Sequence, residues 1–388
     1  MIYVSFFDLL VFSNIFIDNG LFESEYKSNK IKHFNIMNIK IIGSGSYIPD
    51  LIVDNQSFEH NIFLDESGML LNQPNTQILE KFSAITGIKE RRYASAQYVT
   101  SDLAFFAAQK AIEDAGIDRE TIDYILFSHN FGDVKVGMIQ SDMVPCLAAR
   151  AKHKLGIKNP KCVGFDIIFG CAGWTESFIQ ANAYIKSGMA KRILVIGAEC
   201  LSRVTDKHDR DSMIYADGAG AVIVEGTNDD SGLISHESAS YTEEEVKFLF
   251  LGCSFNADSD PNTRYIKMYG RKIYEFALNC VPIAMKSCLD KSGVPIEKLK
   301  KILIHQANEK MDEAIVHRFY KLYKMPVPKD IMPMTIGTLG NSSVATIPTL
   351  YDQLIKGELD NHEIEKGDIL LFASVGAGMN ISAFLYKV

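Results

Sequence analysis

The spacing of apolar residues between positions 164 and 185 predicts a buried strand followed by an amphipathic helix. Residues 164–169 are mostly apolar, and a helical repeat of apolar positions then runs through Trp174, Phe178 and Ile185. Four residues with small side chains, 170–173, separate the two patterns. We therefore expect a tight turn at which the strand ends and the helix begins.

Strands and helices alternate along the rest of the chain as well. Thr100 or Ser101 is expected to cap a helix that Gly116 ends. Strands that alternate with helices indicate an α/β fold. The same patterns predict strands near 37–49, 123–128, 192–197 and 218–224, and helices over 77–84, 101–115 and 142–155.

Two stretches of the chain repeat one another. Residues 109–128 and residues 286–305 both consist of a helical pattern, a glycine stop, a short charged turn and an Ile-Leu strand. In this register Ser128 and His305 end equivalent strands. The repeat predicts an N-terminal half over residues 37–228 and a C-terminal half over residues 229–388.

A second match in the same order pairs Cys171 with Asn341. An Ile-Lys pair follows each of them after fourteen residues (185 − 171 and 355 − 341). Ligands in open α/β sheets bind at the carboxyl ends of the strands, and His305 is also expected at such an end. If the two halves pack about a pseudo-twofold axis, the three side chains can meet.

Composition and charge narrow the class of protein. The chain has 388 residues, of which 47% are hydrophobic and 23% charged, and its net charge is −8. That is typical of a soluble globular protein, and the lack of a basic patch with interleaved aromatics argues against a nucleic-acid partner. The seven cysteines include no Cys-x-x-Cys pair. They therefore indicate a reducing cytoplasm rather than a disulfide framework or structural zinc.

The first 36 residues differ from the rest. Asp8 and Asp18 interrupt an otherwise apolar start, and no Lys or Arg precedes Asp8. This fits neither a signal peptide nor a membrane-spanning helix. We expect the working start at Met37, with residues 1–36 an extension that is loosely held, disordered or the product of a mis-assigned start. No stable membrane insertion is expected.

Cys171 admits two interpretations on local grounds. A cysteine in a tight turn before a helix is exposed to a substrate, and the helix N-terminus favours its thiolate. A free cysteine is also a common buried residue with no chemical role. His305 and Asn341 alone would usually be structural, but three such residues at matched strand ends point to chemistry.

Cysteine, histidine and asparagine together suit two reactions. In a thiol protease, histidine activates cysteine and asparagine orients histidine. In thioester chemistry, the thiolate takes an acyl group, and a carbanion from a second thioester attacks it. Neutral histidine and an amide can donate hydrogen bonds to the developing enolate oxygen without adding negative charge. The doubled α/β architecture is unlike thiol-protease folds, so thioester chemistry is the better fit.

The segments that surround these residues resemble the thiolase-fold condensing enzymes, most closely β-ketoacyl-acyl-carrier-protein synthase III. The resemblance covers residues 37–388. It implies a duplicated five-layer αβαβα fold, a homodimer, an acyl-carrier-protein partner and no cofactor or metal, since the substrates are carrier-protein or coenzyme A thioesters. The matching segments are Thr86–Arg91, Gly170–Gly173, Ala216–Ala221, His305–Asn308, Gly340–Ser343 and Gly376–Gly378.

The resemblance also implies roles for individual residues. Cys171 would carry the acyl group, and His305 with Asn341 would bind the malonyl thioester. Backbone N–H groups of Cys171 and of the loop Gly376-Ala377-Gly378 would form the oxyanion hole. The residues implied to bind the carrier protein or substrate are Lys310, Arg210, Asn308 and Val144. The degradative thiolases carry a second cysteine near the C-terminus. Residues 370–388 of this chain contain no cysteine.

Departures from the family pattern concern the substrate. Lys81 and Ile85 stand where priming enzymes carry the Trp and Arg that sandwich the adenine of coenzyme A, so we expect the acyl donor to arrive on carrier protein. Val144 precedes Pro145 where the family often has Phe, which predicts room for a longer or branched acyl group. The alternatives are a synthase of the dialkylresorcinol type that joins two acyl thioesters, and a non-condensing acyltransferase or partner subunit. Fatty-acid initiation and a specialised lipid or polyketide pathway both stay open.

Overall fold

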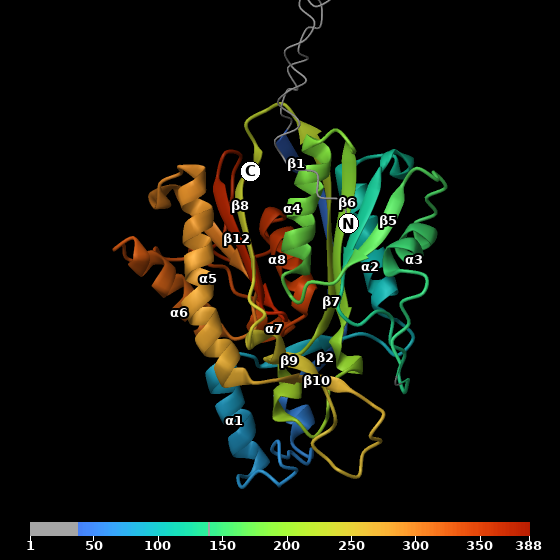
Figure 1. Ribbon diagram of the computed structural model, residues 1–388, viewed down its shortest axis with the longest axis vertical. Helices are drawn as coiled ribbons and strands as arrows, with labels where there is room; N and C mark the ends of the chain where they lie inside the picture. Colours follow the sequence, from blue (N-terminus) through green and yellow to red (C-terminus); the bar gives the residue numbers. More distant parts are fainter. Residues whose placement is uncertain (1–37, 139) are drawn as a thin grey trace, which may run out of the picture. The chain divides into compact units, whose positions relative to one another are not determined.

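Two β-sheets form the framework of the chain in a computed structural model that describes residues 38–138 and 140–388 (Figure 1). The predicted extension, residues 1–36, lies outside the described residues. The first sheet has the strand order β1-β7-β6-β4-β5 and the second has the order β8-β13-β12-β11. Their strands are β1 (Asn38–Tyr47), β7 (Asp217–Thr227), β6 (Arg192–Cys200), β4 (Tyr124–Ser128) and β5 (Val163–Ile167), then β8 (Gly232–Ser240), β13 (Asn380–Lys387), β12 (Ile369–Gly376) and β11 (Leu299–Ile304).

The two sheets repeat one pattern of strand directions. In each of them two successive antiparallel pairings precede a parallel one: β1·β7, β7·β6 and β6·β4 in the first sheet, and β8·β13, β13·β12 and β12·β11 in the second. In the parallel pairings Ser128 stands opposite Gly197, and Ile304 stands opposite Ala373. The end of β4 and the end of β11, directly before His305, are therefore equivalent places.

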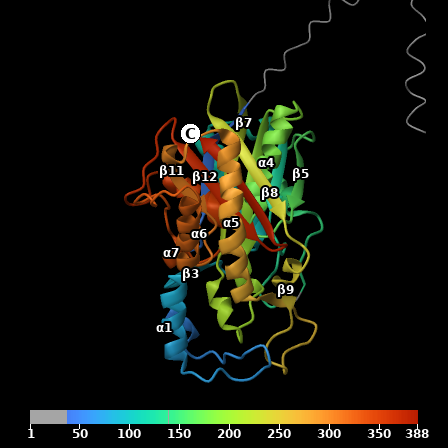
Figure 2. The same ribbon diagram turned by 60° about the vertical axis from the view of Figure 1, so that its left-hand side comes forward.

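Helices fill three layers around the sheets. Two helices, α2 (Thr100–Ala115) and α3 (Leu147–Lys154), pack on the first sheet. Two others, α5 (Gly270–Ser292) and α6 (Glu309–Leu322), cover the second sheet, as both ribbon views show (Figures 1 and 2). Between the sheets lie α4 (Gly173–Lys186) and α8 (Thr346–Ile355), which contact strands of both. This confirms the predicted five-layer αβαβα architecture.

Aromatic stacking holds the central layer together. Phe178 of α4 stacks on Phe384 of β13 with ring centroids 4.5 Å apart, and Phe384 stacks on Phe372 of β12 at 4.4 Å. All three rings are fully buried. Each buried aromatic side chain stabilises the fold by about 1.5–3 kcal/mol. The helix that follows Cys171 is therefore anchored directly to the second sheet.

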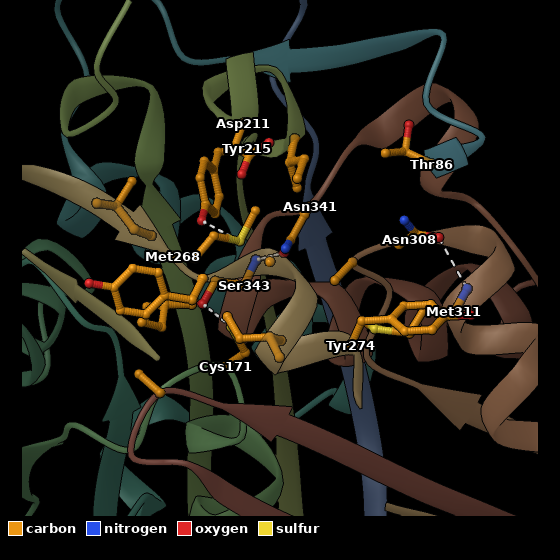
Figure 3. A pocket seen from close by; sticks show the side chains of 18 of the residues that line it. Thr86, Cys171, Asp211, Tyr215, Met268, Tyr274, Asn308, Met311, Asn341 and Ser343 are labelled. Atoms are coloured by element: carbon orange, nitrogen blue, oxygen red, sulfur yellow. Dashed lines mark hydrogen bonds between the residues drawn. The ribbon is translucent and has the colours of Figure 1, made fainter. Parts of the chain in front are cut away.

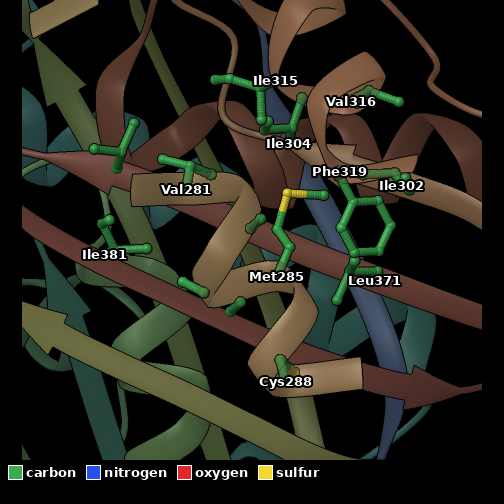
Figure 4. Close-up of a cluster of buried hydrophobic side chains, with 14 of the residues drawn as sticks. Val281, Met285, Cys288, Ile302, Ile304, Ile315, Val316, Phe319, Leu371 and Ile381 are labelled. Atoms are coloured by element: carbon green, nitrogen blue, oxygen red, sulfur yellow. The ribbon is translucent and has the colours of Figure 1, made fainter. Parts of the chain in front are cut away.

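A separate core joins the outer helices to the second sheet. Val281 and Met285 of α5 and Phe319 of α6 pack against Leu371 and Ile381 of the sheet (Figure 4). The recurrence at positions 281, 285 and 288–289 is the i, i+4, i+7 spacing of one helix face. Packing on this face of α5 holds α6 in place. The first turn of α6 follows the loop that contains His305.

Shorter elements gather at the end of the sheets where these helices begin. They include α1 (Asn75–Thr86), α7 (Ile336–Leu339) and the strand pairs β2 (Leu51–Asp54) with β3 (Glu90–Tyr93) and β9 (Leu249–Gly252) with β10 (Tyr265–Met268). In Figure 1 they lie at the lower end of the molecule. Among the described residues no helix is long and apolar enough to cross a bilayer.

Two local predictions were wrong. The helix expected over 142–155 begins only at Leu147, because Asp166 of β5 accepts hydrogen bonds from the N–H groups of Leu147 and Ala148, at 2.8 Å each. At the start of α2 the side chains of Thr100 and Ser101 do not cap their own helix. They bond instead to Gly132 and Asp133. Both helix starts are thus set by contacts distant in sequence.

Candidate active site

A cavity of about 680 Å³ opens where β5, β11 and β12 end. Cys171, His305 and Asn341 all line it. They come from three separate turns, which directly precede α4, α6 and the short 3-10 turn η7 (Ser343–Ala345) that leads into α8. Cys171 and Asn341, which the repeat paired, therefore share one chamber with His305. Figure 3 shows Cys171 and Asn341 in this chamber.

Cys171 lies in the turn between β5 and α4. Gly170 makes this turn with φ of 60°, in the left-handed region that favours glycine. The sulfur accepts a hydrogen bond from the Ser343 hydroxyl at 3.2 Å. Burial raises the pKa of the Cys171 thiol to about 11, because the surrounding protein disfavours the charged form. A backbone hydrogen bond at Cys171 and the bond from Ser343 lower the pKa, but burial has the larger effect.

His305 stands directly after β11 and is 3% exposed. Its backbone N–H bonds to the carbonyl of Ala373 on β12 at 2.9 Å, which continues the sheet pairing to the catalytic end. Burial lowers the pKa of the His305 imidazole to about 4, so the ring is neutral at pH 7. Nδ1 has no hydrogen-bond partner among the described residues. A neutral ring can donate one N–H to a substrate oxygen.

Asn341 is held by its backbone and by its own side chain. Its backbone pairs with the segment beside Tyr215, through bonds of 3.0 Å to the Ile214 carbonyl and 2.8 Å from the Ala216 N–H. Its Oδ1 accepts a hydrogen bond from the N–H of Ser343 at 2.8 Å. The carbonyl side of the amide is thus occupied, which leaves the Nδ2 group to donate toward a ligand.

The loop Gly376-Ala377-Gly378 packs against the backbone of the nucleophile turn. A Cβ atom at Gly376 would lie 2.1 Å from the Cys171 nitrogen, so only glycine allows this approach. Gly376 and Ala377 line the cavity, whereas Gly378 is outside its lining. The first two residues therefore lie beside Cys171 at the cavity, and the oxyanion hole stays a prediction.

The four residues predicted to bind carrier protein or substrate fall into two groups. Asn308 and Arg210 line the cavity, and Asn308 also caps α6 by accepting the Met311 N–H at 3.0 Å. Lys310 is exposed on α6 and Val144 is 88% exposed, and neither lines the cavity. Their predicted roles do not require them to line the cavity of their own chain: Lys310 is expected to dock the carrier protein, and Val144 is expected to limit the acyl pocket of a partner subunit.

The cavity has an apolar interior and a charged mouth. Its interior includes buried Leu201, Tyr215 and Ile266. Lys81 and Ile85 of α1, the two departures from the family pattern, line the mouth together with exposed Arg271 and Lys272 at the start of α5. An alkyl chain fits the first region, and an anionic group fits the second.

Sequence patterns missed three residues next to the nucleophile: Ser343, Asn130 and Glu199. Glu199 carries a detectable signal, since it is a carboxylate within the apolar run of β6. It is 0% exposed, and burial raises its pKa to about 7. Asn130 lies on the loop after β4 and Ser343 begins the η7 turn, and only the fold brings them to Glu199 and Cys171.

Comparison with known proteins agrees with this geometry. The family described as 3-oxoacyl-[acyl-carrier-protein (ACP)] synthase III matches residues 165–242, and its C-terminal part matches residues 289–388. The beta-ketoacyl-[acyl-carrier-protein] synthase III of Staphylococcus aureus (strain Newman) is 34% identical over 352 residues, 90% of this chain and 99% of that protein. The protein of the same name from Staphylococcus haemolyticus (strain JCSC1435) is similar to the same extent.

A solved structure shows the same likeness in three dimensions. The 3-oxoacyl-[acyl-carrier-protein] synthase III of Aquifex aeolicus VF5 superposes with a TM-score of 0.72 and 28% sequence identity. The match covers 90% of this chain and 100% of that one. The likeness therefore extends over both sheets and all the segments that line the cavity.

Proposed function

The chain belongs to the 3-oxoacyl-[acyl-carrier-protein] synthase III family, and from that premise we propose a two-step decarboxylative condensation on Cys171. An acyl group is first transferred to the cysteine, and a malonyl thioester on acyl-carrier protein then extends it by two carbons. The observation that carries the proposal is the meeting of Cys171, His305 and Asn341 in one cavity.

The first step is acyl transfer. The Cys171 sulfur attacks the carbonyl carbon of an acyl thioester, and its proton passes to the departing thiolate. Negative charge develops on the carbonyl oxygen, where the N–H of Cys171 and the adjoining Gly376 loop would receive it. Close packing of Gly376 on the Cys171 turn supports this role, because it holds the two backbone segments together.

The second step is decarboxylation and carbon–carbon bond formation. The malonyl group loses carbon dioxide, and His305 with the Nδ2 of Asn341 donates hydrogen bonds to the enolate oxygen. The enolate carbon attacks the acyl group on Cys171, and the cysteine leaves as a thiolate. The lowered pKa of His305 supports this assignment, since a neutral ring is a donor at every pH above about 5.

We assign the charged mouth to the carrier protein. Lys81, Arg271 and Lys272 gather there, although the whole chain is acidic, and they would receive the phosphate of a carrier-bound pantetheine arm. The apolar interior would take the alkyl part of the acyl group. The preference for a carrier-protein donor rests on Lys81 and Ile85 alone, because exposed Tyr269 and Tyr274 in the same lining offer aromatic planes for an adenine.

A homodimer is also part of the proposal. β5 is the edge strand of its sheet, and Ile168 directly after it is 60% exposed. Val144 and Val163 nearby are 88% and 47% exposed. An apolar edge of this kind is a site where a second copy can pair. In that dimer Val144 would reach the partner's acyl pocket.

Intact-protein mass spectrometry tests the function. We expect the purified chain, mixed with acyl-carrier protein bearing a labelled acyl group, to gain one acyl group on Cys171. Malonyl-carrier protein should then discharge the adduct as a β-ketoacyl product. Cys171→Ala should prevent the adduct, whereas Cys146→Ala, which alters a cysteine outside the cavity lining, should not. Hydrolysis without a β-ketoacyl product would reject condensation.

A further inference from the structure

A chain of hydrogen bonds leads from buried Glu199 to the sulfur of Cys171. The Oε1 of Glu199 accepts hydrogen bonds from the backbone N–H and from the Nδ2 of Asn130, at 2.6 and 2.7 Å. The Nδ2 of Asn130 also donates to the hydroxyl of Ser343 at 3.2 Å. Ser343 in turn donates to the Cys171 sulfur at 3.2 Å. Figure 3 shows this last contact on the cavity wall.

The direction of each bond in this chain is fixed by chemistry. A backbone N–H can only donate, so the Oε1 of Glu199 must be the acceptor whether or not the carboxyl is ionised. This orients the Asn130 amide with its second Nδ2 hydrogen toward Ser343. The Ser343 oxygen therefore accepts from Asn130, and its own proton is left for the Cys171 sulfur. Two acceptors, the Oε1 of Glu199 and the hydroxyl oxygen of Ser343, thus aim one donor at the Cys171 sulfur.

The backbone of Ser343 is held in an unfavourable conformation for this task. Its φ is 55°, in the left-handed region that non-glycine residues seldom adopt. Such a conformation costs about 1 kcal/mol or more and persists where the surroundings require it. The same residue donates its backbone N–H to the Oδ1 of Asn341. Ser343 therefore positions both the nucleophile and the amide that faces the substrate.

Glu199 itself occupies a costly position. Its side chain is fully buried, and its second oxygen, Oε2, has no hydrogen-bond partner within the described part of the chain. A buried acceptor that lacks a partner destabilises a fold by about 1–3 kcal/mol. An apolar residue in β6 would avoid that loss. In exchange, the carboxyl accepts two hydrogen bonds from Asn130. These two bonds set the orientation of the hydrogen-bond chain that ends at Cys171.

We propose that Glu199, Asn130 and Ser343 are positioning residues that keep one hydroxyl donor aimed at the Cys171 sulfur. The donor stabilises the sulfur whenever it carries negative charge. This occurs when the thiol is activated for acylation, and again when the C–S bond breaks in condensation and the sulfur leaves with the electron pair. The inference rests on the proposed nucleophile role of Cys171 and extends it to three residues that do not touch the substrate's reacting carbon.

The pH dependence of Cys171 alkylation tests the proposal. Iodoacetamide is added to the full-length protein between pH 7 and 10, and mass spectrometry follows the carbamidomethyl group on the peptide that contains Cys171. Below its pKa the thiol reacts in proportion to its thiolate fraction. Ser343→Ala should slow alkylation about tenfold across this range, because one hydrogen bond to a charged sulfur is worth roughly one pH unit.

A neighbouring serine provides the matched control. Ser342 is also buried, and its hydroxyl lies 3.5 Å from Thr346. Ser342→Ala should leave the pH profile unchanged. Equal profiles for Ser343→Ala and the unaltered protein would overturn the proposal, and so would equal losses in the two serine variants.

Glu199 variants separate orientation from charge. Glu199→Gln keeps an acceptor oxygen for Asn130, whereas Glu199→Leu removes it. Both variants remove the negative charge of Glu199, which raises the pKa of the Cys171 thiol, so the two variants are compared with each other. We expect Leu to alkylate several-fold more slowly than Gln. Equal rates in the two variants would overturn the orienting role. If Glu199→Leu does not fold, the comparison of Ser343→Ala with Ser342→Ala still tests the proposal.

Alkylation needs no acyl donor, so this test fails independently of the proposed function. Normal alkylation of Cys171 with no acyl adduct would reject the proposed function and leave the positioning chain intact. An acyl adduct that forms and discharges normally in Ser343→Ala, with an unchanged alkylation profile, would reject the positioning chain alone.

Discussion

The N–H of Ser343 donates to the Oδ1 of Asn341 at 2.8 Å, and this bond decides which end of the Asn341 amide faces a substrate. The carbonyl oxygen is turned toward the η7 backbone, and the nitrogen is left to donate. A donor in this place would stabilise an enolate, and an acceptor would repel it.

Asn341→Asp should therefore separate the two steps of the reaction. The carboxylate keeps an oxygen for the Ser343 N–H but places a negative charge beside the enolate. We expect acylation of Cys171 to persist and malonyl decarboxylation to fall by about 10²–10³-fold, the usual effect of losing an oxyanion donor. Carbon dioxide release from labelled malonyl-carrier protein measures the second step. Equal losses of both steps would contradict the assignment of Asn341 to decarboxylation.

Condensation should show no dependence on the titration of His305 above about pH 5. Burial lowers the pKa of this ring from 6.5 to about 4, so it stays neutral from about pH 5 upward. The condensation rate from a preformed acyl enzyme should therefore show no inflection near pH 6.5. Rapid-mixing measurements with acylated protein between pH 5 and 8 isolate this step. An inflection close to 6.5 would place the ring in a solvated environment.

Glu199→Gln should stabilise the fold above neutral pH. Burial raises the pKa of this carboxyl from 4.5 to about 7, so between these values the folded chain holds a proton that the unfolded chain has lost. Stability then falls as pH rises through that window, by up to about 3 kcal/mol for a shift of this size. The glutamine variant does not lose stability in this way, because a glutamine side chain does not titrate. The difference in melting temperature between the variant and the unaltered protein should be larger at pH 8 than at pH 5.

Gly376→Ala should disable acylation. The added Cβ would lie 2.1 Å from the Cys171 nitrogen, and both contacting groups are backbone, so the turn must move. We expect at least a hundredfold loss of adduct formation and destabilisation of about 1–3 kcal/mol. Gly337→Ala is the control, because its Cβ would meet nothing closer than 3.4 Å. Normal acylation in Gly376→Ala would remove this loop from the oxyanion hole.

Ile168→Lys tests the proposed dimer. The residue is 60% exposed after the edge strand β5, and a lysine there opposes pairing with a second copy. Sedimentation velocity should show a dimer for the unaltered chain and a monomer for the variant. Ile283→Lys changes an equally exposed isoleucine, 61% exposed on α5, and should stay dimeric. A dimer in both variants would move the interface elsewhere.

Periodicity and repetition allowed the framework to be predicted because both arise from local spacing. The repeat of residues 109–128 in 286–305 corresponds to helix–strand units that precede equivalent ends of β4 and β11. Cys171 follows β5 and His305 follows β11, as predicted. Asn341 was also expected at a strand end, and this was wrong: it follows the short helix α7, because the second sheet has, among the described residues, no strand in the place of β5.

Contacts between distant segments could not be predicted in this way. The start of α3 is set by Asp166, and the donor to Cys171 comes from Ser343, 172 positions further along the chain. The net pKa of the Cys171 thiol could not be predicted for the same reason. A helix N-terminus is visible in the sequence, but the burial that raises the pKa depends on the whole cavity wall.

The site draws its reacting groups and its walls from different parts of the molecule. Cys171 and Asn341 precede helices that both sheets enclose, whereas the mouth is built from α1 and the start of α5, outside the paired strands of the sheets. The segments that form the mouth can change in length or in side chains without disturbing the turns that carry Cys171 and Asn341. The fold can therefore keep one reaction while exchanging the acyl groups and carriers it accepts, and diversification within the lineage should concentrate at residues such as Lys81 and Ile85.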